Sequence, residues 1–471
     1  MSTFLLMKNY IINGIKLDKY QTKAVFCNKD RYLVIAGAGS GKTLTIVAKV
    51  NYLLENGFKR NEILCISFTN ETVNSLKNKL LSNNIDVDVK TFHRLALDLL
   101  KNKKNISNNY LLDYVIEEFF YSIIYHDNTY KLLEFIDNIE ETKETIKSFI
   151  NQMKGLNYEL SFLFKLIYNK SINTDHKILL ILILKVYIIY EEELISEDKI
   201  DFNDMINFAI KKIDSLKYFP YKYVVIDEYQ DTSICKYLLL KKIIDKFNIK
   251  LMAVGDDYQS IYSFTGCNLS LFINFKKYFN NSKVIKLKNT YRNPSDITII
   301  SKEIVMKNRN QINKRLKSCK YGNKSIVVVY YDDISSINVI IKEIDDILIL
   351  GRNNKDLENI NIDFNNKNIR FLTVHKSKGL EAENVIILNA IDDVLGFPNK
   401  IKSNEVLSYL RNYSYEDEER RLFYVALTRT KNRVFIFTKK YKESIFIKEL
   451  FKDFKWKIKI VDLSKKTLNN C

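Results

Sequence analysis

The feature that most constrains the fold of this chain is the segment 31–43, RYLVIAGAGSGKT. A short apolar, β-branched run at 33–35 leads into glycines, and a helix-compatible stretch follows. In such a unit, glycines let backbone N–H groups approach an anion closely, and the helix N-terminus adds partial positive charge. The alternative is an ordinary glycine-rich turn, but the chain has only 12 glycines and three of them fall here. The segment therefore predicts a phosphate-binding loop inside an α/β fold.

Within this loop, Lys42 is expected to reach the β- and γ-phosphates, and the Thr43 hydroxyl to ligate Mg²⁺. Ala36 stands where the usual pattern has its first glycine, so the match is to a relaxed form of the motif. We expect nucleotide contacts along the whole loop: Ala36, Gly37, Ala38, Gly39, Ser40, Gly41, Lys42 and Thr43.

A second motif, YVVIDEYQD at 223–231, is a buried strand that delivers two adjacent acids at its end. In enzymes with a phosphate loop, the first acid holds Mg²⁺ and the second polarises the attacking water. These roles fall on Asp227 and Glu228. The alternative is a strand that merely ends in a surface acid pair, and the apolar VVI run together with the upstream loop favours the catalytic interpretation.

Two further strand ends carry aromatic and amide side chains. ILCISFTN at 63–70 predicts a strand that presents ligand-binding residues at its end, as open α/β sheets do. In GDDYQSIYSFTG at 255–266, Gln259 could sense a γ-phosphate, and Tyr262 and Phe264 offer flat faces on which bases can stack. Aromatic residues at this spacing could instead form one face of a core strand. His93, at an expected helix start, is equally consistent with a capping role and with nucleic-acid contact.

Composition bounds the remaining possibilities. Long helical periods and almost no glycine mark residues 100–198 as a helical insertion. The formal charge of +18 suits a polyanionic partner, although lysine is abundant throughout, as an AT-rich coding genome would produce. Six scattered cysteines predict reduced thiols in an intracellular protein, with neither disulfides nor a zinc site. The strongest apolar run, 178–190, is too short to span a bilayer and predicts a buried helix, so no membrane contact is expected.

Taken in order, the motifs resemble those of the UvrD/Rep/PcrA-type helicases of superfamily 1: AGAGSGKT, FTNETVNSLK, TFHRLA, DFNDMI, VIDEYQDTS, VGDDYQSIYSFTG, TYRNP, TVHKSKGLE and EERRLFYVALTRTK. The resemblance implies an α/β fold of two RecA-like P-loop domains with parallel sheets, plus one helical insertion in the first. ATP and Mg²⁺ would lie in the cleft between the domains, and single-stranded DNA would cross their top. The implied segments are 1–99 and 200–285 for the first RecA-like domain, 100–199 for the insertion and 286–471 for the second RecA-like domain.

The resemblance also assigns roles to individual positions. Gln21, whose amide can donate to and accept from an adenine edge, and Tyr291 would bind adenine, while Glu381 would contact the ribose. Arg292 and Arg429 would be arginine fingers from the second domain, and Gln259 would couple the γ-phosphate to DNA. The expected catalytic set is Lys42, Asp227, Glu228, Gln259, Arg292 and Arg429; the metal ligands are Thr43 and Asp227; the DNA contacts are Phe68, Asn70, His93, Tyr262, Phe264 and His375.

The sequence therefore predicts an ATP-dependent DNA helicase or translocase acting on single strands and single-strand/duplex junctions, with 3′-to-5′ movement implied by the resemblance only. Relatives carry a second helical insertion, but only about twenty residues separate Gly351 from TVHKSKGL, so that insertion is essentially missing. Weak autonomous unwinding, or dependence on an accessory protein, is expected. The alternatives are an RNA-directed motor, since a base offers the same face in either nucleic acid, and an ATP-binding scaffold that performs no mechanical work.

Overall fold

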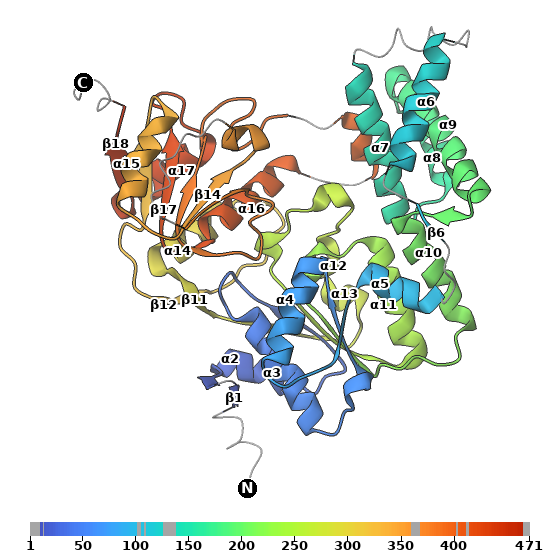
Figure 1. The fold of residues 1–471 in the computed structure, drawn as a ribbon, viewed down its shortest axis with the longest axis horizontal. Coiled ribbons are helices and arrows are strands. Elements are labelled where there is room, and N and C mark those ends of the chain that lie inside the picture. Colours follow the sequence, from blue (N-terminus) through green and yellow to red (C-terminus); the bar gives the residue numbers. More distant parts are fainter. Residues whose placement is uncertain are drawn as a thin grey trace.

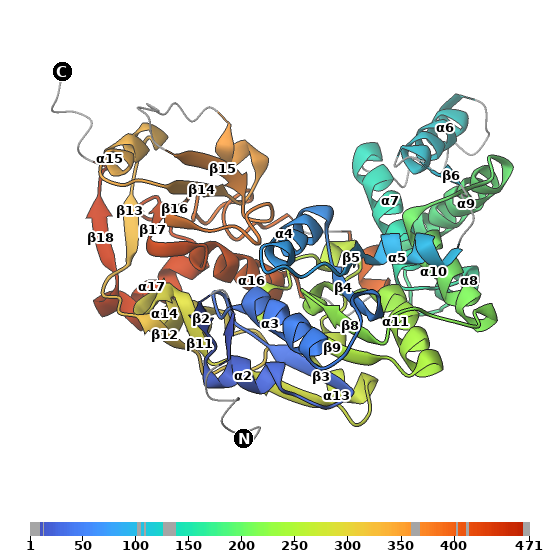
Figure 2. The ribbon, with the colours of Figure 1, turned by 60° about the horizontal axis from the view of Figure 1, so that its bottom comes forward.

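The computed structural model describes residues 10–12, 14–100, 105–107, 110–125, 138–358, 368–401, 404–410 and 414–464. The described residues form two α/β lobes and a cluster of helices that stands to one side of them (Figure 1, Figure 2). The N-terminal part of the chain builds most of the first lobe, and the C-terminal part builds the second. The expected α/β fold of two parallel-sheet units with one helical insertion is confirmed.

The first lobe contains a six-stranded parallel sheet in the order β10-β3-β9-β8-β4-β5. Its strands are β3 (Arg31–Ile35), β4 (Ile63–Ser67), β5 (Asp88–Thr91), β8 (Tyr223–Ile226), β9 (Lys250–Gly255) and β10 (Lys283–Lys286). One face is covered by α2 (Lys19–Val25), α3 (Lys42–Glu55) and α4 (Asn70–Leu81). The other face is covered by α5 (Phe92–Leu100), α10 (Phe202–Lys212), α11 (Ile234–Phe247), α12 (Ser270–Ile273) and α13 (Phe275–Tyr278).

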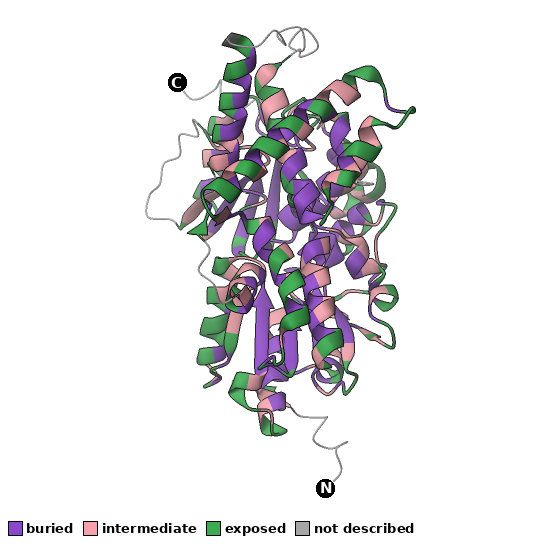
Figure 3. Cartoon of the chain, turned by 90° about the vertical axis from the view of Figure 1, so that its right-hand side faces the viewer, coloured by how far each residue is buried: buried purple, intermediate pink, exposed green. Residues whose placement is uncertain are grey.

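The apolar runs of these strands follow from burial on both faces. In β3, Tyr32 and Val34 pack into the layer with α3, whereas Leu33 and Ile35 pack into the layer with α11. A parallel sheet with helices on both faces needs apolar side chains at successive positions, which is why the central strands β3, β9, β8 and β4 are mostly apolar. The edge strands β5 (DVKT) and β10 (KVIK) are less buried and carry more polar residues. Figure 3 shows the buried strands enclosed by helices whose outer faces are exposed.

The second lobe contains another six-stranded parallel sheet, in the order β15-β14-β16-β17-β13-β18. Its strands are β13 (Ile326–Tyr330), β14 (Ile347–Gly351), β15 (Ile369–Thr373), β16 (Ala382–Ile387), β17 (Thr430–Thr438) and β18 (Lys459–Asp462). One face carries α14 (Ser295–Val305), α16 (Tyr415–Leu427) and α17 (Ile445–Phe454), and the other carries α15 (Ile337–Lys342). Three two-stranded sheets complete the described strands: β1 (Ile11–Ile12) with β2 (Ile15–Lys16), β6 (Asn105–Ile106) with β7 (Lys199–Ile200), and β11 (Asn289–Pro294) with β12 (Lys317–Lys320).

The helical insertion consists of α6 (Leu111–Tyr125), α7 (Ile139–Gly155), α8 (Leu160–Ile167) and α9 (Thr174–Ser196). Of the expected helical stretch 100–198, residues 101–104, 108–109 and 126–137 lie outside the described residues. A short 3₁₀ segment of the second lobe, Glu405–Leu410, reaches across to this insertion; we call it the strap. Its Val406, Leu407 and Leu410 are buried in the core that α6, α7 and α9 build, so one core contains side chains from distant parts of the chain.

The prediction that 178–190 forms a buried helix holds for one side of the helix only. The run lies in α9, but Ile181, Ile188 and Ile189 keep 36%, 39% and 38% of their surface exposed. The apolar residues of α9 lie on every side of the helix, so its sequence carries no polar stripe that would identify the face exposed to solvent. Within the described ranges, no helix is both long and apolar enough to cross a membrane. The five cysteines that the structure describes are unpaired, and Cys471 lies outside the described residues.

Candidate nucleotide cleft and aromatic groove

The phosphate loop lies at a cavity of about 410 Å³ between the two lobes. The first lobe contributes the loop and α4, and the second contributes β11, β12 and the residues around β16 and β17. Five cations face one carboxylate in its lining: Gly39, Ser40, Gly41, Lys42, Thr43, Leu44, Lys79, Tyr291, Arg292, Lys320, Glu381 and Lys431. A cavity with this excess of positive charge, at a helix N-terminus, suits a polyphosphate. Of these cations, Lys79, Lys320 and Lys431 are absent from the sequence-based site.

Glycine is required at two positions of the loop. Gly39 and Gly41 have φ angles of +68° and +80°, in the left-handed region that other residues rarely adopt. A Cβ at Gly39 would collide with Arg292 of the second lobe, and a Cβ at Gly41 would collide with the Gln21 amide. Gly41 is also the N-cap of α3 and places no side chain over the first turn, which leaves its backbone N–H groups open to an anion.

The first half of the loop is covered by the second lobe and does not line the cavity. The Ala38 carbonyl accepts a hydrogen bond from Thr290 Oγ1 at 2.7 Å, and the Ala36 carbonyl accepts one from Lys314 Nζ at 3.1 Å. The Leu316 side chain packs against Gly37. The expected nucleotide contacts of Ala36, Gly37 and Ala38 therefore fall on residues already engaged by the protein.

Lys42, the expected catalytic lysine, and Glu228, the second acid, form an ion pair. Lys42 Nζ lies 2.6 Å and 2.8 Å from the two carboxylate oxygens of Glu228. Burial alone would raise the pKa of Glu228, but the ammonium groups of Lys42 and Lys378 hold that pKa below its usual range. Burial and the neighbouring Glu228 raise the pKa of Asp227. Asp227 follows β8 and Thr43 lies in the first turn of α3, so a carboxylate and a hydroxyl, both hard oxygen ligands, are available to Mg²⁺.

Both expected arginine fingers have partners within the protein. Arg292 Nε donates to Glu381 Oε2 at 2.7 Å, so the predicted finger and the predicted ribose contact are paired with each other. Arg429 is only 1% exposed and donates to Gln259 Oε1 at 3.2 Å. Burial and the nearby Arg292 lower the pKa of Arg429 to about 9. The structure thus joins Arg429 and Gln259 directly across the two lobes.

The two expected adenine contacts differ in exposure. Gln21 is only 2% exposed; its Oε1 accepts from the Asp18 backbone N–H and its Nε2 donates to the Ser40 carbonyl. The side chain therefore braces the phosphate loop and does not present its amide to the cavity. Tyr291 lines the cavity and is 42% exposed, and its hydroxyl donates to Asp18 Oδ2 at 2.8 Å. That bond fixes the ring at the entrance, where a flat face can stack on a base.

Two lysines of the second lobe, both missed by the sequence-based site, form buried ion pairs with the first lobe. Lys378 Nζ lies 2.5 Å from Asp231 Oδ2, donates to the Gln259 carbonyl at 2.8 Å and lies over the Tyr262 ring at 4.7 Å. Lys314 pairs with Asp256 and Asp257. Lys378 lies within the basic TVHKSKGLE motif, which could have revealed it, whereas the sequence around Lys314 carries no comparable signal.

The expected DNA contacts converge on a second site, away from the cleft. The Phe68 and Tyr262 rings stack at 5.6 Å, and Phe264 and His375 pack edge to face at 5.8 Å. Phe68 and Phe264 line a cavity of about 510 Å³ whose far wall is α7 of the helical insertion; we call it the aromatic groove. Its lining is Phe68, His93, Glu144, Lys147, Ser148, Asn151, Gln152, Phe202, Asn203, Ser233, Lys236, Phe264 and Thr265.

The remaining expected DNA contacts, His93, His375 and Asn70, differ in how far they are buried. Burial and the nearby Lys236 lower the pKa of His93 to about 4. Burial together with Arg352 and Lys378 lowers the pKa of His375 to about 4. Both rings are therefore neutral at pH 7. His93 packs edge to face with Phe202 at 5.5 Å. Asn70 begins α4 and is exposed, outside the lining of the aromatic groove.

Comparison with known proteins shows that the chain is similar to helicases. A model of the UvrD/REP helicase N-terminal domain matches residues 17–280, and a model of the viral superfamily 1 RNA helicase core domain matches residues 177–438. The chain is 27% identical to DNA helicase IV of Escherichia coli, over 93% of this chain and 70% of that protein. It is 29% identical to the ATP-dependent DNA helicase Rep of Buchnera aphidicola and 27% identical to the ATP-dependent DNA helicase PcrA of Bacillus subtilis. These two matches cover 70% and 69% of this chain but only 51% and 44% of the relatives, so the chain spans about half of their length.

Proposed function

Because the chain belongs to the UvrD/REP helicase family, we propose that it is an ATP-driven motor that moves along single-stranded DNA and separates duplexes. The observation that carries this proposal is a line of contacts from Arg429, which lies near Arg292 of the cation-rich cleft, to Tyr262, which stacks on Phe68 of the aromatic groove. Arg429 bonds to the Gln259 side chain, Lys378 bonds to the Gln259 carbonyl, and Lys378 lies over Tyr262. We also retain the four-segment division of the chain, 1–99, 100–199, 200–285 and 286–471.

Each residue around the cleft would have a separate role in ATP hydrolysis. Lys42 exchanges its ion pair with Glu228 for the substrate phosphates, which frees the Glu228 carboxylate to accept a proton from the attacking water. Bound through Thr43 and Asp227, Mg²⁺ would supply neutralisation of phosphate charge. Arg292 leaves Glu381 and, with Arg429, stabilises the developing charge. Fingers of this kind contribute roughly 10³–10⁵ in rate.

Movement along DNA would follow from closure and opening of the cleft. The stacked Phe68 and Tyr262 belong to the first lobe, whereas His375 belongs to the second, and Tyr262 donates to the His375 carbonyl at 3.2 Å. A displacement between the lobes would therefore shift the surfaces on which bases stack, which is how rigid-body closure becomes strand movement. We extend the proposal to 3′-to-5′ movement, to single-strand/duplex junctions as substrates, and to an accessory protein that supports unwinding.

The match to the viral superfamily 1 RNA helicase core model favours a second candidate, an RNA-directed motor. Both candidates use stacking, which does not distinguish the two nucleic acids. The test is steady-state ATP hydrolysis measured alone, with single-stranded DNA and with RNA of the same sequence. Stimulation by DNA well above that by RNA supports the leading proposal, the reverse supports the RNA motor, and hydrolysis that neither strand stimulates contradicts both.

Replacement of Phe264 by alanine is expected to weaken single-strand binding by roughly 5- to 150-fold, because base–aromatic stacking contributes about 1–3 kcal/mol per base. Phe264 is 54% exposed, so the change leaves the core intact. The measurement is fluorescence anisotropy with a labelled oligonucleotide at fixed salt concentration. Tyr168→Ala, which removes an 80% exposed ring from the helical insertion, is the matched control. Equal affinities for Phe264→Ala and the control would exclude a stacking role for Phe264.

A further inference from the structure

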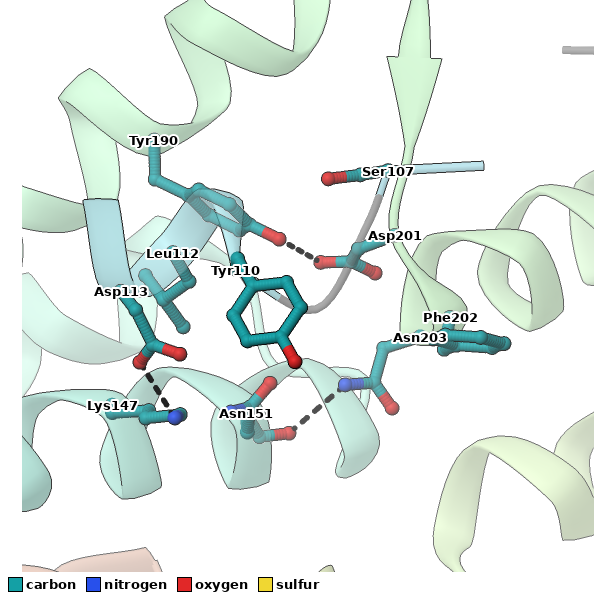
Figure 4. Close-up of a pocket in the computed structure, with 10 residues that line it drawn as sticks. All are labelled: Ser107, Tyr110, Leu112, Asp113, Lys147, Asn151, Tyr190, Asp201, Phe202 and Asn203. Carbon is teal, nitrogen blue, oxygen red and sulfur yellow. Dashed lines mark hydrogen bonds and ion pairs between the residues drawn. The ribbon is translucent and has the colours of Figure 1, made fainter. Parts of the chain in front are cut away.

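A second cavity, of about 460 Å³, adjoins the aromatic groove on the helical-insertion side; we call it the outer pocket (Figure 4). The two cavities share four lining residues: Lys147, Asn151, Phe202 and Asn203. The pocket extends beyond them to Tyr110, which directly precedes α6, and to Tyr190 and Asp201. Asp201, Phe202 and Asn203 lie in the DFNDMI motif, but the sequence-based site assigns no role to any residue of this pocket.

The walls of the outer pocket offer two aromatic rings to a ligand. Phe202 is 43% exposed and already contacts His93 on the groove side. Tyr110 is 74% exposed, and Figure 4 shows its hydroxyl directed toward Asn151 and Asn203. Exposed aromatic rings of this kind stack on nucleobases without reading sequence. Asparagine amides can both donate and accept, so they can bond to the edge of any base.

The charged groups of the pocket are already compensated. Lys147 lies 2.6 Å from Asp113, and Asp201 lies 2.6 Å from the buried Lys154. The Tyr190 hydroxyl also donates to Asp201 at 3.2 Å. No free cation is left among the described lining residues to attract a phosphate, so the pocket favours the neutral ring of a nucleotide over its phosphate.

An independent observation indicates a ligand in the adjoining aromatic groove, next to the residues that the two cavities share. Gln152 of α7 lines the aromatic groove, is only 2% exposed, and donates from Nε2 to Ser148 Oγ at 3.0 Å. Its Oε1 atom is buried and has no hydrogen-bond partner within the described residues. An unsatisfied buried acceptor is costly, and a ligand with an N–H or O–H donor would relieve that cost. The exocyclic amine of adenine, cytosine or guanine, or the N3–H of thymine, supplies such a donor.

We propose that the outer pocket is a further nucleotide subsite, which takes one unstacked base of the strand that occupies the aromatic groove. The subsite extends the bound single strand onto the helical insertion. This inference rests on the proposed function, because a strand must first occupy the groove. Phe202 is the boundary between the two sites, and Tyr110 is the stacking partner that belongs to the outer pocket alone.

The test measures affinity against strand length. Oligothymidylates of increasing length are titrated into the protein and into Tyr110→Ala, with Tyr114→Ala as the matched control; Tyr114 is 57% exposed on the next turn and does not line the pocket. For the unaltered protein and the control, affinity is expected to rise until the strand fills both sites. For Tyr110→Ala, the last increment, about 5- to 150-fold, should be lost while the shortest strands bind as before.

Three outcomes would overturn the subsite: equal affinities at every length, an equal loss at every length, and a loss in Tyr114→Ala that matches the loss in Tyr110→Ala. A second measurement places 2-aminopurine at successive positions of the strand. One position should show fluorescence quenching in the unaltered protein and in Tyr110→Phe but not in Tyr110→Ala. Failure of the proposed function looks different, because ATP hydrolysis by the unaltered protein would then not be stimulated by single-stranded DNA, whatever the strand affinities of the variants.

Discussion

Replacement of Glu228 by glutamine is expected to lower DNA-stimulated ATP hydrolysis by about 10²–10⁴-fold, the range that a positioned general base contributes. The amide keeps the size of the side chain and can still accept a hydrogen bond from Lys42, which lies 2.6 Å from the carboxylate. It cannot accept the proton of the attacking water. Since Lys42 would no longer be held by a full negative charge, nucleotide affinity should be equal or higher.

The measurement pairs steady-state hydrolysis at saturating single-stranded DNA with titration of a fluorescent ATP analogue. Glu192→Gln makes the same chemical change at an exposed position of α9 and should leave both quantities unaltered. A Glu228→Gln rate within a few-fold of the unaltered protein would remove Glu228 from the role of base. A loss of nucleotide affinity would instead assign Glu228 to shaping the cleft.

Replacement of Lys314 by methionine is expected to lower the free energy of unfolding by about 3–5 kcal/mol, the usual cost of breaking a buried ion pair by removing one partner. Lys314 is 1% exposed, and its ammonium group lies 2.6 Å from Asp257, pairs with Asp256 and lies 3.7 Å from the Tyr258 ring centroid. Both carboxylates are fully buried, so without the lysine two negative charges lie side by side in the interior.

Urea unfolding followed by fluorescence measures this loss, with Lys185→Met, an exposed lysine of α9, as the control. Adding Asp257→Asn to Lys314→Met should restore part of the stability, because one of the uncompensated charges is then removed. A double-mutant cycle isolates the interaction between the two side chains. A loss below about 1 kcal/mol for Lys314→Met would mean that the carboxylates protonate or find other partners, and that the lysine does not hold the lobes together.

Much of the cleft could be predicted because its residues lie at the ends of strands within short segments. Lys42 follows β3 by seven positions, and Glu228 follows β8 by two. The carboxyl ends of parallel strands meet at one edge of a sheet, so each local pattern also fixes a position in space. The aromatic groove followed from the same rule, since Phe68 follows β4.

Contacts between the lobes could not be predicted in this way. Lys314 meets the carbonyl of Ala36, 278 positions earlier, and no period or spacing marks a residue whose partner is set by packing. The same applies to Gln21, where an amide suited to adenine is instead used to brace the phosphate loop through Ser40. The pairing of Arg292 with Glu381 likewise depends on where the strands of the second lobe lie. The motifs TYRNP and TVHKSKGLE, which contain these two residues, do not predict that placement.

Through the strap, the second lobe also contributes to the core of the helical insertion. The insertion enters the chain through the first lobe, yet Val406, Leu407 and Leu410 of the second lobe complete its core, and His176 of α9 lies 2.7 Å from the Tyr409 hydroxyl. Deletion of residues 105–200 would leave these three apolar side chains of the strap exposed to solvent, although the sequence of the second lobe gives no sign that it contacts the insertion. A truncated variant should therefore either lack both the insertion and the strap or retain both.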